Sequence, residues 1–328
     1  MKLLTFRHPE TGVPSPGVLF DDHWILDLSP AAPAAGEEEI PSIDALIAAG
    51  DEGIAHARRV LMHAKANPAS ATLHALPAVV LLAPFQPIQL RCFSVYPRHM
   101  RNATRQVLAH DHGPLVRLAG RLLMKAASKR FLARPVYYKG THTHIVGPDA
   151  PILRPPYGER LDYELELGVV IGKKGREISE GDALTHIFGY TIFNDVSARK
   201  QLRHEVGSIG GTGPTKGKDF DHSNIIGPWI VTRDEIEDPQ QLQGIARLNG
   251  KEVGRGHTGG MAHSVARQIA HLSHGETIYP GELIGTGAME NCCGIEHWRF
   301  LEEGDEVELE IERIGTLASR VVPRVGTA

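Results

Sequence analysis

Two glutamates, Glu164 and Glu166, flank a single leucine in a stretch that otherwise has the character of a buried β-strand. Side chains alternate between the faces of a strand, so the two carboxylates share one face, with Cα atoms roughly 6.5–7 Å apart. Like charges beside the apolar run 169–171 are costly unless a positive charge compensates them. A hard divalent cation would do so, because carboxylate oxygens suit it. The alternative is a half-exposed strand with a solvated acidic face.

The composition is that of an ordinary globular protein and narrows the choice of partners. The chain has 328 residues, 41% hydrophobic and 23% charged, with a net charge of −4, so nothing favours nucleic acid or an anionic membrane. No apolar run is long enough to span a bilayer, and no signal peptide is evident. Cys92, Cys292 and Cys293 do not form a disulfide framework, so we expect a reducing cytoplasm. The 35 glycines and 22 prolines predict many turns and a β-rich fold.

The chain divides into a small N-terminal part and a larger C-terminal part. We expect a small α/β domain over residues 1–85, because prolines at 84 and 87 interrupt the chain before a new strand at 89–95. Residues 86–328 form the larger domain. Within it, residues 100–131 have helical character and are expected to be either a lid over a site or a plain amphipathic surface helix. The other expected strands are 2–6, 17–20, 23–28, 145–146, 163–171, 188–194, 229–232, 245–248 and 306–312, and the other expected helices are 43–48, 51–61 and 265–272.

A third candidate metal ligand, Asp195, ends another run of β-branched and aromatic residues. An aspartate at the end of a strand can be a simple cap or a metal ligand. The Lys-Gly-Lys at 216–218 further along is not a phosphate loop, because Thr212 stands where the first glycine is required and Asp219 where serine or threonine is required.

One further acidic strand serves as a contrast. Residues 306–312 alternate glutamates with Val307, Leu309 and Ile311, beside a turn at Gly304-Asp305. This pattern predicts a strand with one buried face and one solvated acidic face, and we assign it no function.

Four motifs in the same order resemble those of the fumarylacetoacetate hydrolase family. They are the Glu-x-Glu strand at Glu164–Glu166, the Asn-Asp-x-Ser-Ala-Arg turn at Asn194–Arg199, the Lys-Gly-Lys-x-Phe-Asp segment at Lys216–Asp221, and the Gly-Thr-Gly at Gly285–Gly287 with an acidic motif after it. The likeness covers residues from about 90 to the end, and the N-terminal part is similar to the small leading domain of longer members. It implies a mixed, β-rich α+β fold with a β-roll or β-sandwich catalytic domain over 86–328, in a homodimer.

The resemblance also implies a metal site. Glu164, Glu166 and Asp195 match the family's metal-binding carboxylates, with Mg²⁺, or else Ca²⁺ or Mn²⁺, as the ion. The fourth carboxylate of true fumarylacetoacetate hydrolases falls near Cys92, which suits a hard ion poorly. Smaller members of the family manage with three carboxylates.

The resemblance further implies residues for catalysis and for substrate binding. His99 is the implied general base, oriented by Glu296. The resemblance implies a catalytic role for Lys218 and a substrate-binding role for Arg199. Both cations would neutralise the charge of a substrate carboxylate or of a developing oxyanion. Tyr138 is the implied further contact to substrate.

The activity that the resemblance implies is metal-dependent hydrolysis of a carbon–carbon bond. The substrate would be a small 1,3-dicarbonyl or acylpyruvate, cleaved through a metal-stabilised enolate. The same site could instead serve a decarboxylase, a hydratase or dehydratase, or an isomerase of a 2-oxo acid. A non-catalytic protein that binds a metal and an oxo acid is the alternative outside enzymes. Leu202 and Ala288 stand where the family often has glutamine and threonine, which leaves the exact substrate open.

Overall fold

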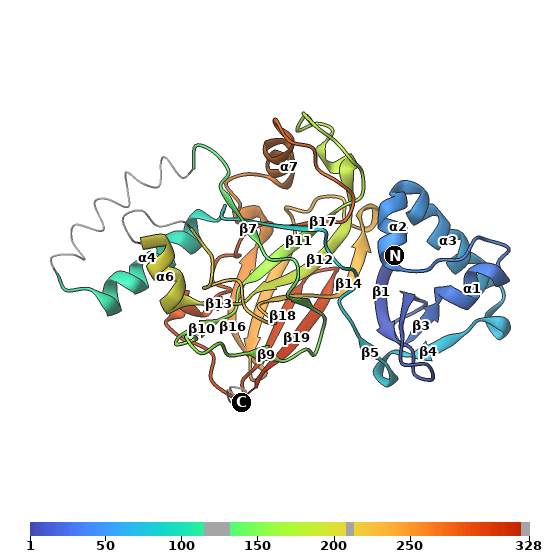
Figure 1. Cartoon of the computed structure of the whole chain (residues 1–328), viewed down its shortest axis with the longest axis horizontal. Coiled ribbons are helices and arrows are strands. Elements are labelled where there is room, and N and C mark those ends of the chain that lie inside the picture. The colour runs from blue at the N-terminus through green and yellow to red at the C-terminus, as the bar shows by residue number, and fades with distance from the viewer. Residues whose placement is uncertain (115–131, 208–212, 323–328) are drawn as a thin grey trace.

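The computed structural model describes residues 1–114, 132–207 and 213–322, and the expected mixed, sheet-rich α+β architecture is confirmed. Sheets occupy the middle of the molecule, the N-terminal helices lie at one end, and α4 (Pro97–Asp111) and α6 (Arg199–Gly207) lie at the other (Figure 1). Most of the segment expected to form a lid, residues 115–131, lies outside the described residues. Within the described ranges, no helix has both the length and the apolar character needed to cross a bilayer.

The largest sheet has twelve strands and runs through the whole molecule. Its order is β4 (Leu73–Ala75), β3 (Trp24–Asp27), β2 (Pro14–Leu19), β1 (Lys2–Arg7), β14 (Asn224–Thr232), β12 (Ile187–Asp195), β11 (Leu165–Ile171), β17 (Glu282–Gly285), β6 (Gln89–Phe93) and β7 (Tyr137–Gly140), while β5 (Val80–Leu81) pairs with β1 and β8 (Ile145–Val146) with β14. The N-terminal strands therefore belong to the same sheet as the strands that carry the candidate site.

A second, five-stranded sheet packs against one face of the first. Its order is β16 (Lys251–His257), β15 (Gln243–Leu248), β18 (Glu306–Ile311), β19 (Gly315–Val322) and β9 (Ile152–Leu153), and a separate pair joins β10 (Leu161–Asp162) to β13 (Ser197–Ala198). As predicted, the apolar residues of β18 are buried and its glutamates are partly exposed.

Helices cover the ends and the remaining face of the sheets. They are α1 (Leu28–Ala34), α2 (Ile43–Ala49), α3 (Asp51–Ala66), α4 (Pro97–Asp111), α6 (Arg199–Gly207) and α7 (Val265–Ser273), with 3₁₀ turns η1 (Pro68–Ser70), η2 (Leu76–Ala78), η3 (Ala183–His186), η4 (Arg233–Glu235), η5 (Thr258–Gly260) and η6 (Gly294–His297). The strand expected at 23–28 ends at Asp27, because the carboxylate of Asp27 accepts from the Ser29 amide and caps α1, a helix that the sequence analysis did not predict.

Strand β11 is buried on both faces, which explains its nearly continuous apolar sequence. Leu165, Leu167 and Val169 belong to the core between the two sheets. Val170 points the other way, into a core shared with the N-terminal helices. Glu166 lies on that second face and Glu164 directly precedes the strand, and both are buried, so the solvated acidic face considered as an alternative is not present.

Candidate metal centre and active site

Three buried carboxylates converge where β11 and β12 meet. Glu164 and Glu166 come from the β11 segment, and Asp195 is the last residue of β12, the strand paired with β11. One oxygen from each lies within 4.8 Å of the others. Exposed fractions of 5%, 1% and 1% place all three away from bulk water. The structure therefore brings together the three residues expected to be metal ligands.

Two buried cations lie among these carboxylates. Lys218 Nζ is 2.8 Å from Glu164 Oε2 and 2.7 Å from Asp195 Oδ2. Arg199 Nη2 is 2.6 Å from Glu164 Oε1 and 2.7 Å from Asp162 Oδ2. The two cations expected to meet substrate are thus already engaged by acids of the chain.

The charges of this cluster do not balance within the chain. Asp162, Glu164, Glu166 and Asp195 supply four buried carboxyl groups against two cations, so two negative charges are left over when all four are ionised. Asp195 Oδ1 is also buried without a hydrogen-bond partner among the described residues. An excess of two negative charges on hard oxygen donors, one of them unpartnered, fits a divalent cation such as Mg²⁺ or Mn²⁺.

The pKa values of the three carboxyls differ because the cations are unevenly placed. Burial opposes ionisation of Glu164, but Arg199 and then Lys218 outweigh it and lower its pKa to about 2. Burial, reinforced by Asp195 and Glu164, raises the pKa of Glu166 well above its usual value. Burial also raises the pKa of Asp195, which Lys218 offsets only in part. Ionisation of Glu166 and Asp195 is therefore unfavourable in the metal-free site, and a bound dication would offset that cost.

We expect Mg²⁺ to raise the melting temperature, and to raise it more as the pH increases from about 5 to about 8. Groups with raised pKa values hold protons that the unfolded chain has already released, so the metal-free fold loses stability as the pH rises above the ordinary carboxyl values of 4.5 and 3.8. A bound dication would replace those protons and remove the penalty. Thermal unfolding with excess Mg²⁺ or with EDTA across this range measures the effect, and a Mg²⁺ shift that is the same at every pH would contradict it.

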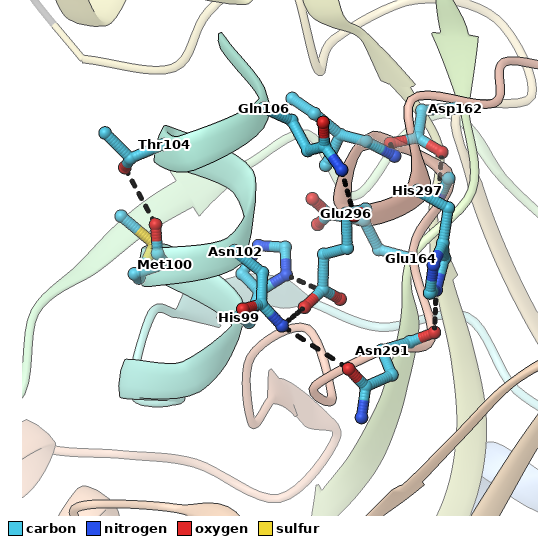
Figure 2. A network of polar contacts seen from close by, with 12 residues as sticks. His99, Met100, Asn102, Thr104, Gln106, Asp162, Glu164, Asn291, Glu296 and His297 are labelled. Atoms are coloured by element: carbon cyan, nitrogen blue, oxygen red, sulfur yellow. Dashed lines mark hydrogen bonds and ion pairs between the residues drawn. The ribbon is translucent and has the colours of Figure 1, made fainter. Parts of the chain in front are cut away.

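A histidine and a glutamate face each other beside the carboxylate cluster (Figure 2). His99 is the buried residue of α4, and its Nδ1 lies 3.1 Å from Oε2 of Glu296, which is in η6. Although burial opposes ionisation of Glu296, its contact with His99 lowers its pKa. Cys293, which lies in one group with His99 and Glu296, forms a β-bridge with Glu164, so the pair lies next to the carboxylates.

Glu296 is held on both sides by contacts that the sequence analysis did not identify. Asn102 Nδ2, one helical turn after His99, donates to Glu296 Oε1 at 3.1 Å, and Gln106 Nε2 donates to the Glu296 carbonyl at 3.0 Å (Figure 2). On the other side, the carboxylate of Asp162 accepts from the amides of Gly294 and Ile295 at the start of η6, at 2.7 and 3.0 Å.

Tyr138, the remaining predicted contact, and two departures from the family pattern, Cys92 and Ala288, lie close to the site. Tyr138 donates to Asp195 Oδ2 at 2.7 Å, so it contacts one of the candidate metal ligands. Cys92 pairs with Tyr138 across β6 and β7 and is buried. Ala288 lies in a small apolar cluster with Ala103 and Val107 of α4. The alanine that replaces the expected threonine thus helps to seat the helix that carries His99.

Replacing Asn102 with alanine is expected to lower kcat about tenfold with little change in KM, because Glu296 would lose a charge-assisted hydrogen bond. A shift in the pH profile of kcat should accompany the loss, since Glu296 orients His99. Thr104→Ala is the matched control, because the Thr104 hydroxyl bonds the Met100 carbonyl in the same helix. Equal effects of the two substitutions would indicate a general disturbance of α4 instead.

The chain matches one protein family and resembles known proteins of that family. The family described as fumarylacetoacetate (FAA) hydrolase C-terminal matches residues 93–322, the part that contains every residue of the cluster. The chain belongs to the fumarylacetoacetate hydrolase family. Members of this family that resemble it include oxaloacetate tautomerase YisK of Bacillus subtilis (strain 168), 33% identical over 314 residues that cover 93% of this chain and 95% of YisK. Human mitochondrial oxaloacetate tautomerase FAHD2A is 39% identical over 193 residues, 57% of this chain, and the chain spans 59% of the length of that relative.

A solved structure extends the family likeness to the whole fold. The fumarylacetoacetate hydrolase from psychrophilic Exiguobacterium antarcticum superposes with a TM-score of 0.74 at 27% identity, covering 99% of this chain and 100% of that one. The N-terminal strands and helices are therefore part of the shared fold. Because these family members are enzymes of more than one kind, membership supports an enzyme and leaves the reaction to be argued from the site.

Proposed function

We propose that this chain is a metal-dependent enzyme that moves a proton at the carbon beside the carbonyl of a small 2-oxo acid, as in keto–enol tautomerisation of oxaloacetate. The observation that carries the proposal is the buried excess of two negative charges beside the His99–Glu296 pair. It combines a place for a dication with a place for proton transfer. The full-length likeness to YisK, named as an oxaloacetate tautomerase, supports this reaction over others.

Glu164, Glu166 and Asp195 would hold the ion, which we propose to be Mg²⁺, with Mn²⁺ or Ca²⁺ as substitutes. Once bound, the ion would polarise the 2-oxo group and stabilise enolate charge. Lys218 and Arg199 fix Glu164 in place and limit the negative charge that surrounds an anionic substrate. Tyr138 holds Asp195 through its hydroxyl, and we propose that its ring borders the substrate.

His99 is the proposed proton carrier. Its Nδ1 faces Glu296, which leaves Nε2 as the nitrogen that exchanges a proton with substrate. The lowered pKa of Glu296 keeps that carboxylate ionised, so it stabilises the imidazolium formed when His99 accepts a proton. Burial of the pair excludes competing water from the exchange.

The second candidate is hydrolysis of the carbon–carbon bond of an acylpyruvate-type substrate. It is favoured by the same buried His–Glu pair, which can activate water as readily as it can accept a carbon-bound proton. Enolate formation is common to both reactions, and decarboxylation of a 2-oxo acid would use it as well. Residues 86–328 as the catalytic domain, the homodimer and the cytoplasmic location stay predictions.

A substrate panel separates these reactions. Oxaloacetate, acylpyruvates and simple diketones are each supplied with Mg²⁺ or with EDTA, and enol absorbance and release of pyruvate are followed. The proposal expects faster keto–enol exchange of oxaloacetate with Mg²⁺, abolished by EDTA and with the carbon skeleton intact. Cleavage of an acylpyruvate without accelerated exchange would establish the second candidate. Turnover unaffected by EDTA would refute both.

A further inference from the structure

A second group of donor atoms, chemically different from the carboxylate cluster, lies beside it. His99, Cys293 and Glu296 each offer one donor atom, and the three atoms lie within 4.8 Å of one another in the buried interior. This set combines a nitrogen, a sulfur and an oxygen, whereas the carboxylate cluster offers oxygen alone. Imidazole and thiolate donors favour Zn²⁺ over Mg²⁺ or Ca²⁺.

Two atoms of this group are buried without hydrogen-bond partners. His99 Nδ1 and Glu296 Oε2 lie 3.1 Å apart as an ion pair, and neither atom has a further partner among the described residues. The residues are only 7% and 5% exposed. The pair thus presents a nitrogen and an oxygen at a separation that two ligands of one ion can adopt.

Backbone contacts of Cys293 and of the next residue, Gly294, fix the position of Cys293. Its backbone forms a β-bridge with Glu164, and the amide of Gly294 donates to Asp162 at 2.7 Å. The adjacent Cys292 points elsewhere, with its sulfur 3.9 Å from the carbonyl oxygen of Gly244. The cysteine pair thus places one sulfur in this group and directs the other into the core.

We propose that His99, Cys293 and Glu296 form a Zn²⁺ site distinct from the carboxylate site. Three protein ligands would leave one position of a tetrahedral ion for water. Cys293 would bind as the thiolate, and its proton would pass to solvent on binding. An ion held there occupies His99 and Glu296, so Zn²⁺ inhibits the enzyme even when the carboxylate site holds Mg²⁺. Only this inhibition rests on the proposed function.

The binding test uses Co²⁺ as a spectroscopic probe for Zn²⁺. The full chain is saturated with Mg²⁺, Co²⁺ is added, and the near-ultraviolet charge-transfer band of a Co²⁺–thiolate bond is followed. We expect the band in the wild type, its loss when Zn²⁺ is added, its absence in Cys293→Ser and its retention in Cys292→Ser. No band in the wild type, or an unchanged band in Cys293→Ser, would overturn the proposal.

The affinity for Zn²⁺ gives a quantitative test of the proposed site. Changes to the indirect partners of metal ligands already shift affinity by about 10–100-fold, so loss of the thiolate should weaken Zn²⁺ binding at least about 100-fold. If Cys293→Ser fails to fold by circular dichroism, His99→Gln replaces it, and a Co²⁺ band of unchanged affinity in that variant would refute the site.

The activity arm compares turnover with and without Zn²⁺ within each variant at saturating Mg²⁺. The wild type and Cys292→Ser should be inhibited at low Zn²⁺ concentration, and Cys293→Ser only at a concentration at least about 100-fold higher. Equal inhibition of Cys292→Ser and Cys293→Ser would count against the inhibitory role. If no oxo acid is turned over at all, the proposed function fails, while the cobalt band still decides whether the zinc site exists.

Discussion

Replacing Glu166 with glutamine is expected to remove metal-dependent turnover while making the metal-free protein more stable. Loss of one carboxylate weakens a site that supplies several kcal/mol of transition-state stabilisation, so turnover should fall at least about 10³-fold. In the metal-free fold, Glu166 is a buried acid beside two others, and its pKa is raised for that reason. The neutral amide removes this cost, so it should raise the free energy of unfolding of the metal-free protein at neutral pH.

Urea unfolding in EDTA, Mg²⁺ titration by calorimetry and turnover assays measure the two opposite effects. The matched control is Glu308→Gln on β18, a partly exposed glutamate of the contrasting acidic strand, which should change neither quantity. A Glu166→Gln protein that binds Mg²⁺ as the wild type does would show that the carboxylates are not the metal ligands.

Replacing His99 with glutamine is expected to lower turnover by about 10²–10⁴-fold, the usual contribution of a general acid–base residue, and to leave Mg²⁺ affinity unchanged. Glutamine keeps polarity and similar length but cannot accept and return a proton near neutral pH. The measurements are kcat, KM and the Mg²⁺ dissociation constant of the same preparation.

His204→Gln is the control for this substitution, because His204 is exposed on α6. A parallel fall in Mg²⁺ affinity with His99→Gln would place His99 among the metal ligands. Unchanged turnover would exclude it as the proton carrier.

The alternation of side chains between the two faces of a strand was the most informative signal in the sequence. It predicted that Glu164 and Glu166 share a face, and the apolar run after them predicted burial that the solvated glutamates of 306–312 do not share. The same reasoning could have predicted that Asp162 shares this face, since it lies two residues before Glu164. In the structure, Asp162 contacts Arg199 and the start of η6. The fold class could also be predicted from the sequence, because patterns typical of β-strands dominate it.

Contacts between distant segments could not be predicted from local pattern. Asn102 and Glu296 are 194 positions apart in the sequence, and they come into contact only because α4 packs beside η6. The local sequence predicts that Cys293 belongs to a packed turn, and only the folded structure shows its sulfur beside His99 and Glu296. His99 and Glu296 were found through the family motifs, since one histidine before a helix is not distinctive by itself.

Strand β1 lies hydrogen-bonded between β2 and β14, with Leu3 opposite Ile230. A fragment that began after residue 85 would therefore leave that stretch of β14 as an open edge, and would uncover Ile226 and Ile230, which pack with Leu3 and Leu46. Open, apolar edges recruit strands from other molecules and lead to aggregation. The first eighty-five residues thus cover an edge of the sheet that holds the carboxylates, and an isolated C-terminal part, residues 86–328, would be prone to self-association.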